Sequence, residues 1–351
     1  MSSQIPDYRG KTILITGGTG SFGHTVTGKL LARDVDEIRI LSRDEAKQDL
    51  MRHEMADPRL RFYLGDIRDY LSVERAMQNV DHVFHSAALK QVPSGEFFPM
   101  EIVRTNVYGS ENVVRAAESA GVTSLVCLST DKAVYPVNAM GMSKALMEKV
   151  AQSHGLNNSN AVTTVSCVRY GNVMYSRGSV IPLFIRQVKA GKNLTVTNPE
   201  MTRFMMSLES SVDLVEFAFH NAAQGDLFIR KAKACTVNDL AQAVINLFHA
   251  SSSIDVIGTR HAEKVSEALA NREELSRAQD MGDYFRIRAD NRDLNYSIYI
   301  EEGDVSQTGY DDYDSHTVDR LDVAGVEQLL LTLPEVRAEL TAAGHLLTRA
   351  S

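Results

Sequence analysis

An aspartate and a lysine stand side by side directly after an apolar run, a position from which they could perform acid–base chemistry. The run at residues 124–128 has the composition of a buried strand, and Ser129, Thr130, Asp131 and Lys132 follow it. A neighbouring acid and base can protonate a leaving hydroxyl and remove a carbon-bound proton when burial adjusts their pKa values. The alternative interpretation is a structural ion pair between Asp131 and Lys132.

A glycine-rich turn after the first apolar run predicts a dinucleotide-binding site. The run Thr12–Thr16 is followed by Gly17-Gly18-Thr19-Gly20-Ser21-Phe22-Gly23 and then by a helical pattern. Glycines let the backbone turn tightly and approach a pyrophosphate, and the helix N-terminus offers its free N–H groups. A glycine pattern alone is weak evidence, but its place between a strand and a helix makes it specific.

The residues after the second apolar run favour NADP over NAD. The run at 37–41 is followed by Ser42, Arg43 and Asp44, and Lys47 comes one turn later. An acidic residue here would bind the 2′-hydroxyl of NAD, whereas basic residues suit the 2′-phosphate of NADP. Arg43 and Lys47 therefore predict NADP. The alternative is a solvated Arg43, with Asp44 on the ribose.

Further residues extend this expected site. Asp66 and Ile67 follow the third apolar run, where related enzymes hold the adenine, and Ala87 and Ala88 would let a cofactor pass over the fourth.

Lys144 follows Met140 by four residues, so a helix places both on one face. Such a lysine can hydrogen-bond a nicotinamide ribose, and a surface lysine is the alternative. The Met140 thioether has no proton to exchange.

Apolar runs alternate with helical patterns through the first half of the chain. This alternation predicts an α/β fold of the Rossmann type, a doubly wound parallel sheet with helices on both faces. The regularity weakens after about residue 170. We therefore expect a dinucleotide-binding domain over residues 1–170 and a smaller substrate-binding lobe over 171–351, with some chain returning to the sheet. Residues 301–320 are acidic, and we expect an ordered arm there before a helix over 323–331.

The composition is that of a globular chain without a membrane segment. The 351 residues are 44% hydrophobic and 23% charged, and no apolar run approaches the ~20 residues that span a bilayer. Three widely spaced cysteines argue against disulfides or a metal site, and Cys127 and Cys167 are expected to be buried thiols in a reducing cytoplasm. A net charge of −8 argues against nucleic-acid binding.

Four basic residues in the second half could converge on a diphosphate, for which guanidinium groups give paired hydrogen bonds. They are Arg177, Arg203, Arg260 and Lys264. From spacing alone, each of them is more often a surface charge.

Taken together, these motifs resemble those of the extended short-chain UDP-N-acetylglucosamine 4,6-dehydratases. The similar segments are TGGTGSFG (16–23), SRDE (42–45), GDIRD (65–69), AALKQVP (87–93), STDKAVYP (129–136), RYGNV (169–173), RGSVIPLF (177–184) and MTRFMMS (201–207). MGMSK (140–144), IGTRHAEK (257–264) and RADNRDLNY (288–296) resemble the inverting, CapE-like branch of capsule synthesis. Most relatives have tyrosine where this chain has Met140. Ala262 replaces an expected glycine and Ser266 an expected aromatic residue, and both bear on uridine-diphosphate contacts.

The resemblance implies a complete reaction. Oxidation of carbon 4 by NADP makes the proton on carbon 5 acidic, Lys132 removes that proton, and Asp131 protonates the leaving hydroxyl of carbon 6. Hydride returns to carbon 6, and protonation of carbon 5 from the opposite face gives the L-sugar. Thr130 would hold the carbon 4 oxygen and Lys144 the nicotinamide ribose. Lys132 or water would take the carbon 4 hydroxyl proton, since Met140 has no role in proton transfer.

The resemblance also implies the binding residues and the assembly. Those for the dinucleotide are Gly17, Thr19, Gly20, Ser21, Phe22, Gly23, Ser42, Arg43, Lys47, Asp66, Ile67, Ala87, Ala88, Lys90 and Lys144. Those for UDP-N-acetylglucosamine are Lys90, Asn172, Arg177, Val180, Arg203, Arg260 and Glu263. A homo-oligomer, a hexamer, is expected, with a product that feeds L-fucosamine-type sugars of capsule or O-antigen.

Two other functions compete with this one. A UDP-sugar 4-epimerase needs chemistry only at carbon 4, so Asp131 and Lys132 would be redundant and the missing tyrosine costly. A catalytically silent nucleotide-sugar-binding protein would explain Met140, but not the presence of Asp131, Lys132 and Lys144 together.

Overall fold

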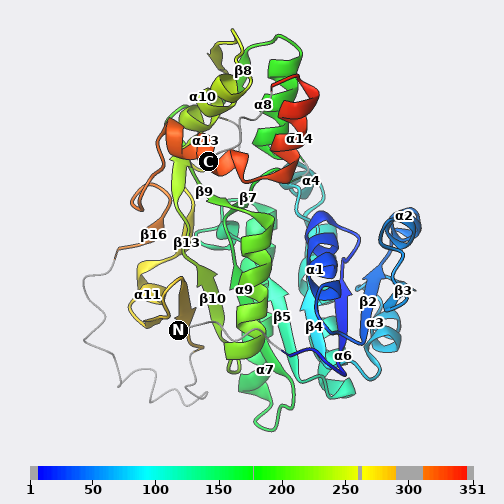
Figure 1. Cartoon of the computed structure of the whole chain (residues 1–351). Helices are drawn as coiled ribbons and strands as arrows, with labels where there is room; N and C mark the ends of the chain where they lie inside the picture. Colours follow the sequence, from blue (N-terminus) through cyan, green and yellow to red (C-terminus); the bar gives the residue numbers. More distant parts are fainter. Residues whose placement is uncertain (1–6, 177, 260–262, 290–310, 346–351) are drawn as a thin grey trace, which may run out of the picture. The chain divides into compact units, whose positions relative to one another are not determined.

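The chain forms two compact units, each assembled from several separate segments. The computed structural model describes residues 7–176, 178–259, 263–289 and 311–345 (Figure 1). The first unit comprises Met1–Tyr170, Glu209–Lys231 and Leu269–Asp312, and the second comprises Gly171–Leu208, Ala232–Ala268 and Tyr313–Ser351. A single boundary at residue 170 is therefore too simple, because two later segments return to the first unit.

A nine-stranded sheet forms the centre of the first unit, in the order β14-β15-β10-β6-β5-β4-β1-β2-β3. The strands are β1 (Thr12–Thr16), β2 (Glu37–Ser42), β3 (Leu60–Leu64), β4 (His82–His85), β5 (Ser124–Leu128), β6 (Thr164–Arg169), β10 (Leu227–Arg230), β14 (Ala278–Asp280) and β15 (Tyr284–Ile287). Pairing is parallel from β3 to β10, and β15 and β14 add an antiparallel edge. This sheet confirms the predicted doubly wound architecture.

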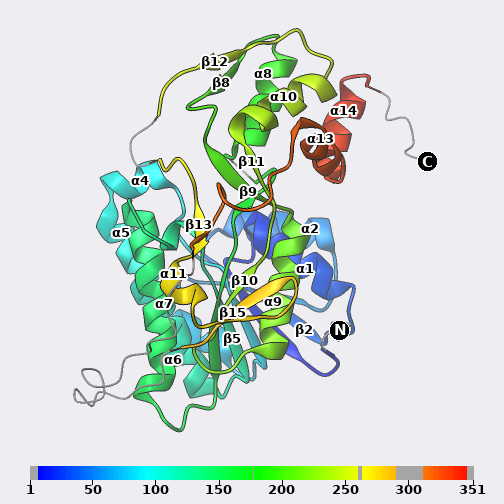
Figure 2. The same cartoon turned by 90° about the vertical axis from the view of Figure 1, so that its left-hand side faces the viewer.

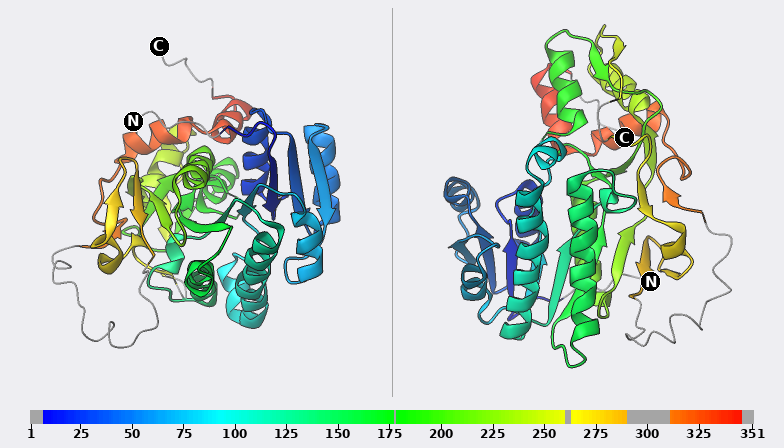
Figure 3. Two further views of the ribbon diagram at one scale, coloured as in Figure 1. Left: turned by 90° about the horizontal axis from the view of Figure 1, so that it is seen from below. Right: turned by 180° about the vertical axis from the view of Figure 1, so that it is seen from behind.

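Helices cover both faces of the sheet, as Figures 2 and 3 show. The helices of this unit are α1 (Ser21–Leu31), α2 (Glu45–Met55), α3 (Tyr70–Met77), α4 (Val92–Phe97), α5 (Pro99–Val103), α6 (Gly109–Ala120), α7 (Ala139–Asn157), α9 (Leu208–Asn221) and α11 (Arg272–Leu275). A π-helical turn, η1 (Arg104–Tyr108), joins α5 to α6, and a 3₁₀ turn, η2 (Asp131–Ala133), follows β5.

The two faces of each central strand are buried by different helices. In β1, Ile13 and Ile15 belong to a core cluster that includes Val26 of α1 and Val215 of α9. Leu14 lies between them in the strand and is equally buried, so its side chain faces the opposite side of the sheet. Burial on both faces explains why these parallel strands appear in the sequence as short apolar runs.

The second unit has its own core and small sheets. Its elements are β7 (Asn172–Val173), α8 (Val180–Lys189), β8 (Leu194–Val196), β9 (Thr202–Met206), β11 (Ala234–Thr236), α10 (Val237–Leu247), β12 (Ile254–Val256), β16 (Tyr313–Asp314), α13 (Val323–Leu331) and α14 (Pro334–Ala342). β13 (Ala268–Ala270) lies where the chain passes back into the first unit. Strand β9 pairs with β7 and β11, and α8 and α10 supply much of the core.

The sequence led us to expect buried thiols and the absence of a membrane segment, and the structure bears on each point. Cys127, Cys167 and Cys235 are free and buried, and Cys127 lies opposite Cys167 in the register of β5 and β6, as expected for buried thiols. Within the described part of the chain, none of the helices combines the length and the apolar character needed to cross a bilayer.

Candidate active site

The glycine-rich loop between β1 and α1 is tightly packed, and the backbone N–H groups at its junction with α1 lack a side-chain cap. Gly17 has a φ of +69°, which L side chains rarely adopt, and a Cβ there would lie 2.8 Å from the Cα of Ala87. A Cβ at Gly23 would lie 2.4 Å from the Cα of Gly18, so only glycine lets the loop close on itself. Gly20 precedes α1 without a side-chain cap, which leaves the first N–H groups of the helix available to an anion.

A solvent-open pocket of about 750 Å³ lies over this loop. It gathers most of the residues predicted to bind the dinucleotide: Gly17, Thr19, Gly20, Ser42, Arg43, Lys47, Asp66, Ile67, Ala87 and Ala88. Four further lining residues are Leu41, Asp44, Gly65 and Thr105. The loops after β1 to β4 therefore converge at the carboxyl edge of the sheet, where open α/β folds bind ligands.

Asp44 lines the pocket and also caps α2, where it pairs with Lys47. One carboxylate oxygen accepts from the backbone N–H of Lys47 (3.1 Å), and the other accepts from the Lys47 ammonium group. These bonds lower the pKa of Asp44. Arg43 lies 3.8 Å from the Asp66 carboxylate and keeps about half of its side chain exposed. This arrangement leaves Arg43 and Lys47 as basic groups that line the pocket.

Thr105 is a pocket residue that sequence reasoning missed. It sits on the π-helical turn η1 and is 6% exposed. Its hydroxyl oxygen has no hydrogen-bond partner among the described residues. Because a buried polar atom normally has a partner, a ligand group is a suitable one here. The sequence signal was weak, since a π-helical turn has no recognisable residue pattern.

Three predicted dinucleotide residues serve the packing of α1 and do not line the pocket. Ser21 begins the helix, and Gly23 closes the loop. The ring of Phe22 packs against Phe84 and Tyr170, with centroids 5.3 and 5.5 Å apart.

Asp131 and Lys132 form an ion pair at the carboxyl end of β5. The Lys132 ammonium lies 3.0 Å from Oδ1 of Asp131, and the Thr130 hydroxyl donates to the same oxygen at 2.7 Å. Asp131 is 1% exposed, and its Oδ2 is buried without a partner among the described residues. An unsatisfied carboxylate oxygen in a buried site is costly, so this oxygen is available to a polar group of a ligand.

Helix α7 packs its first turn directly against this pair. Asn138 caps the helix by accepting from the Gly141 N–H at 2.9 Å, and Met140 is 4% exposed. A Cβ at Gly141 would lie 2.3 Å from the carbonyl oxygen of Lys132, so only glycine permits this approach. The hydroxyl of Ser129 donates to Glu148 further along α7. Of the two hydroxyls before Asp131, only that of Thr130 therefore faces the carboxylate.

Two predicted lysines lie in different surroundings. Lys144 is buried, its ammonium donates to the carbonyl oxygen of Leu128 at 2.7 Å, and desolvation lowers its pKa to about 8. Lys90 follows Leu89, whose N–H and carbonyl are both held by Asn106, and partial burial lowers its pKa. Neither lysine is among the residues that line the dinucleotide pocket.

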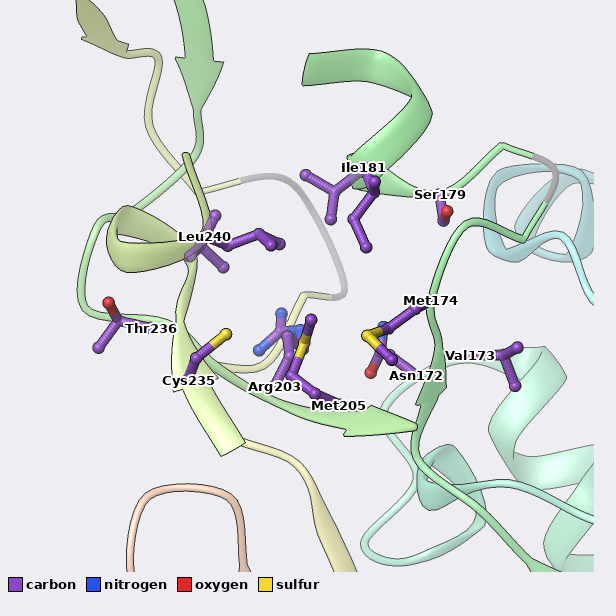
Figure 4. Close-up of a pocket in the computed structure, with 12 residues that line it drawn as sticks. Asn172, Val173, Met174, Ser179, Ile181, Arg203, Met205, Cys235, Thr236 and Leu240 are labelled. Carbon is purple, nitrogen blue, oxygen red and sulfur yellow. The ribbon is translucent and has the colours of Figure 1, made fainter. Parts of the chain in front are cut away.

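A second pocket lies wholly within the second unit (Figure 4). Three residues predicted to bind the sugar nucleotide, Asn172, Val180 and Arg203, line it. The rest of the lining is mainly apolar and consists of Val173, Met174, Ser179, Ile181, Met205, Cys235, Thr236, Val237 and Leu240.

The polar side chains of this pocket are of two kinds: some are buried without a described hydrogen-bond partner, and one donates to backbone carbonyl oxygens. Asn172 Oδ1 and Ser179 Oγ are buried without hydrogen-bond partners in the described structure. The guanidinium of Arg203 donates to the carbonyl oxygens of Thr202 (2.7 Å) and Lys264 (3.0 Å). A mostly apolar lining with a few polar groups is typical of small-molecule sites.

The remaining predicted substrate residues do not join this lining. Arg177, Arg260 and the departure at Ala262 lie outside the described residues. Glu263 is described but does not line the pocket, and Lys264 lies 3.6 Å from Glu267. At the second departure, the hydroxyl of Ser266 donates to Asp314 at 2.9 Å.

A metal-binding cluster is not found in the described part of the chain, where no three His, Cys, Asp or Glu side chains come together suitably.

Comparison with known proteins gives matches over nearly the whole chain. Residues 13–289 match the family model described as "Polysaccharide biosynthesis protein", and residues 290–337 match "Polysaccharide biosynthesis protein C-terminal". A protein of Rickettsia rickettsii (strain Sheila Smith) named "UDP-glucose 4-epimerase" is 53% identical over 334 residues, which cover 94% of this chain and 98% of that protein.

Two solved structures are also similar. Pen from Bacillus thuringiensis is 34% identical, with a TM-score of 0.85 over 93% of this chain and 100% of that one. DesIV, a dTDP-glucose 4,6-dehydratase from Streptomyces venezuelae solved with NAD, is 24% identical, with a TM-score of 0.65 over 72% of this chain and 86% of that one, and shows the shared fold alone. With its Rossmann-type, doubly wound parallel sheet, this chain belongs to the polysaccharide biosynthesis protein family.

Proposed function

We propose that this protein is an NADP-dependent UDP-N-acetylglucosamine 4,6-dehydratase that also inverts carbon 5. Its product would be UDP-2-acetamido-2,6-dideoxy-β-L-arabino-hexos-4-ulose, a precursor of L-fucosamine-type sugars in capsule or O-antigen. The proposal includes a homo-oligomeric assembly, a hexamer, in the cytoplasm. Membership of a polysaccharide biosynthesis family supports this general role.

The observation that carries the proposal is the Asp131–Lys132 pair. Asp131 has one oxygen occupied by Thr130 and Lys132 and the other buried without a partner among the described residues. A 4,6-dehydratase needs a base for the proton on carbon 5 and an acid for the leaving hydroxyl on carbon 6. In the proposal a proton passes from the Lys132 ammonium to Asp131 along their hydrogen bond. Lys132 is then that base and Asp131 is that acid, while Thr130 binds the carbon 4 oxygen.

The residues around the first pocket fit a nicotinamide dinucleotide. The loop at Gly17 has no room for a side chain, and the buried hydroxyl of Thr105 has no partner in the described structure. The basic side chains of Arg43 and Lys47 also line the pocket, each beside a carboxylate, Asp66 and Asp44 respectively. When bound, the nicotinamide would accept hydride from carbon 4 and return it to carbon 6. Because Asp44 is engaged at the cap of α2, we favour NADP, whose 2′-phosphate suits Arg43 and Lys47.

We assign the nucleotide end of the substrate to the pocket of the second unit. Asn172 Oδ1 and Ser179 Oγ are buried polar atoms without a described partner in an otherwise apolar lining, and the charged Arg203 lies beside them. In the proposal this pocket takes the uridine diphosphate, with Val180 against its apolar part. Arg177, Arg260 and Glu263 remain proposed contacts from the family resemblance.

A UDP-sugar 4-epimerase is the second candidate, because the curated Rickettsia relatives bear that name. Epimerisation requires only reversible oxidation at carbon 4, so it leaves Asp131 and Lys132 without a catalytic task. Its usual phenol is replaced by Met140, which is buried and has no exchangeable proton.

Incubation with UDP-N-acetylglucosamine in deuterium oxide separates the two candidates. The dehydratase yields a product that has lost one water, carries deuterium at carbon 5, and is a 4-keto sugar of the L series by proton NMR. The epimerase yields a product of unchanged composition with inverted carbon 4. If neither product forms while NADP and the sugar nucleotide bind, the enzyme proposal is wrong and the protein is a binding protein.

A further inference from the structure

A buried chain of hydrogen bonds runs through His85 beneath the first pocket. Thr16 ends β1 and pairs with His85, the last residue of the neighbouring strand β4. The hydroxyl of Thr16 lies 2.7 Å from Nδ1 of His85, and Nε2 of His85 lies 2.8 Å from the hydroxyl of Ser110. All three residues are at most 1% exposed. These hydrogen bonds therefore link β1, β4 and α6 in a region that water does not reach.

The direction of each bond follows from counting protons. Ser110 must donate its single hydroxyl proton to the carbonyl oxygen of Asn106 at 2.7 Å, because a carbonyl only accepts. The Ser110 oxygen then accepts from the Nε2–H of His85. Burial lowers the pKa of His85 to about 3, so the ring is neutral and Nδ1 is an acceptor. The hydroxyl of Thr16 therefore donates to Nδ1, and one tautomer of His85 is fixed.

At Thr16, the row of hydrogen bonds connects the two pocket loops that follow β1 and β4. The Thr16 hydroxyl accepts from the backbone N–H of Ala87 at 3.3 Å, and the hydroxyl of Ser86 donates to the Thr16 carbonyl at 2.7 Å. Gly17 follows Thr16, and it packs so closely on Ala87 that a Cβ would clash. Because Gly17 and Ala87 both line the pocket, the spacing between these walls depends on the atoms that hold Thr16.

We propose that His85 is a positioning residue for the dinucleotide, acting through Thr16 to hold the β1 and β4 loops at the spacing that the ligand requires. The inference rests on the proposed function only for the presence of a dinucleotide in this pocket. Its binding measurements are independent of the sugar and of the reaction, and only its turnover measurement uses the proposed reaction. Nothing in the local sequence signalled it, because Thr16 and Ser110 are separated from His85 by 69 and 25 residues.

His82 provides a matched control for this role. It lies at the other end of the same strand and makes one comparable hydrogen bond, 2.7 Å from Nδ1 to the hydroxyl of Ser124. A change of His82 to phenylalanine perturbs β4 without touching Thr16 or Ala87. It therefore reports what a merely structural histidine contributes to dinucleotide binding.

The test is titration of NADP and NAD into the wild type, His85→Phe, His85→Asn and His82→Phe, with thermal unfolding of each protein. We expect His85→Phe to weaken binding by at least about 10-fold, the scale of one hydrogen bond, and His82→Phe by less than about 2-fold. His85→Asn can still accept from Thr16, so it should recover most of the affinity. With saturating dinucleotide, turnover of the His85→Phe protein should return to near the wild-type value.

Each outcome has one meaning. If the wild type binds neither dinucleotide, the proposed function fails at its cofactor. If the wild type binds but His85→Phe binds as tightly, or His82→Phe loses as much, the positioning role is overturned and the proposed function stands. Should His85→Phe not fold, His85→Leu removes the same bond with a smaller side chain and carries the same expectation, whereas Thr16→Val would also remove the bond from the Ala87 N–H.

Discussion

Replacing Asp131 by asparagine separates the two halves of the proposed reaction. The amide has the size of the carboxylate, and its oxygen can still accept from Thr130 and Lys132, which lie 2.7 and 3.0 Å from Oδ1. The change therefore removes the negative charge of the resting ion pair, and with it the group that would carry the acid proton, without opening a cavity. Hydrogen bonds to a charged group are about 1 kcal/mol stronger than neutral ones, so we expect a loss of stability of that order.

The effect on catalysis should be far larger and confined to one step. General acid catalysis contributes about 10²- to 10⁴-fold, so water loss from carbon 6 should slow by that factor. Oxidation at carbon 4 does not require the acid. We therefore expect the Asp131→Asn protein to bind NADP with wild-type affinity and to accumulate reduced dinucleotide together with an undehydrated 4-keto sugar.

The assay combines absorbance of the reduced dinucleotide with mass spectrometry of the quenched sugar nucleotide. Asp69→Asn is the matched control, because Asp69 caps α3 on the surface and asparagine caps equally well. Water loss at the wild-type rate in Asp131→Asn would refute the role of Asp131 as the acid. Loss of NADP binding would instead show that the carboxylate shapes the cofactor pocket.

Three further perturbations test other parts of the site. Arg43→Ser should weaken NADP by about 10-fold and leave NAD nearly unchanged, as binding titrations would show, because Arg43 is proposed to contact the 2′-phosphate; an equal loss for both dinucleotides would contradict this. Met140→Tyr should not raise turnover substantially, and a large gain in steady-state rate would undermine proton transfer without a phenol. The pKa of Lys144 is lowered from 10.5 to about 8, so as pH rises the folded state loses this proton before the unfolded state does. The unfolding free energy of the wild type should therefore rise relative to that of Lys144→Met between about pH 8 and 10.5, by roughly 3 kcal/mol in urea titrations, and parallel curves would contradict the buried charge.

The sequence predicts the local parts of the fold well. Strands β1, β2 and β5 and helix α13 were identifiable because each is a run of apolar residues with a regular spacing and a clear end in the sequence. The return of β10 and β15 to the same sheet was not identifiable in detail. Their runs are short, and their partners lie far away in the chain, so pairing is decided by tertiary packing.

In the candidate site, too, the parts made of neighbouring residues were predictable, and the parts that the fold brings together were not. The glycine loop and the Asp131–Lys132 pair are contiguous in sequence, so their chemistry was recognisable before any coordinates. The convergence of Asn172 and Arg203 came from the family resemblance, since nothing in their spacing indicates it. The His85 chain depends on contacts between distant strands and helices, and no local pattern encodes such contacts.

The interleaving of the two units has a consequence for the order of events during synthesis. The sheet of the first unit obtains β10 only after residue 230 and β15 only after residue 287 have emerged from the ribosome. Until then the edge of β6 lacks its parallel neighbour and exposes unpaired backbone groups, a state prone to aggregation. A fragment that stops near residue 170 should therefore contain the glycine loop and the Asp131–Lys132 pair and yet be poorly soluble. A fragment that extends through residue 289 includes every strand of that sheet.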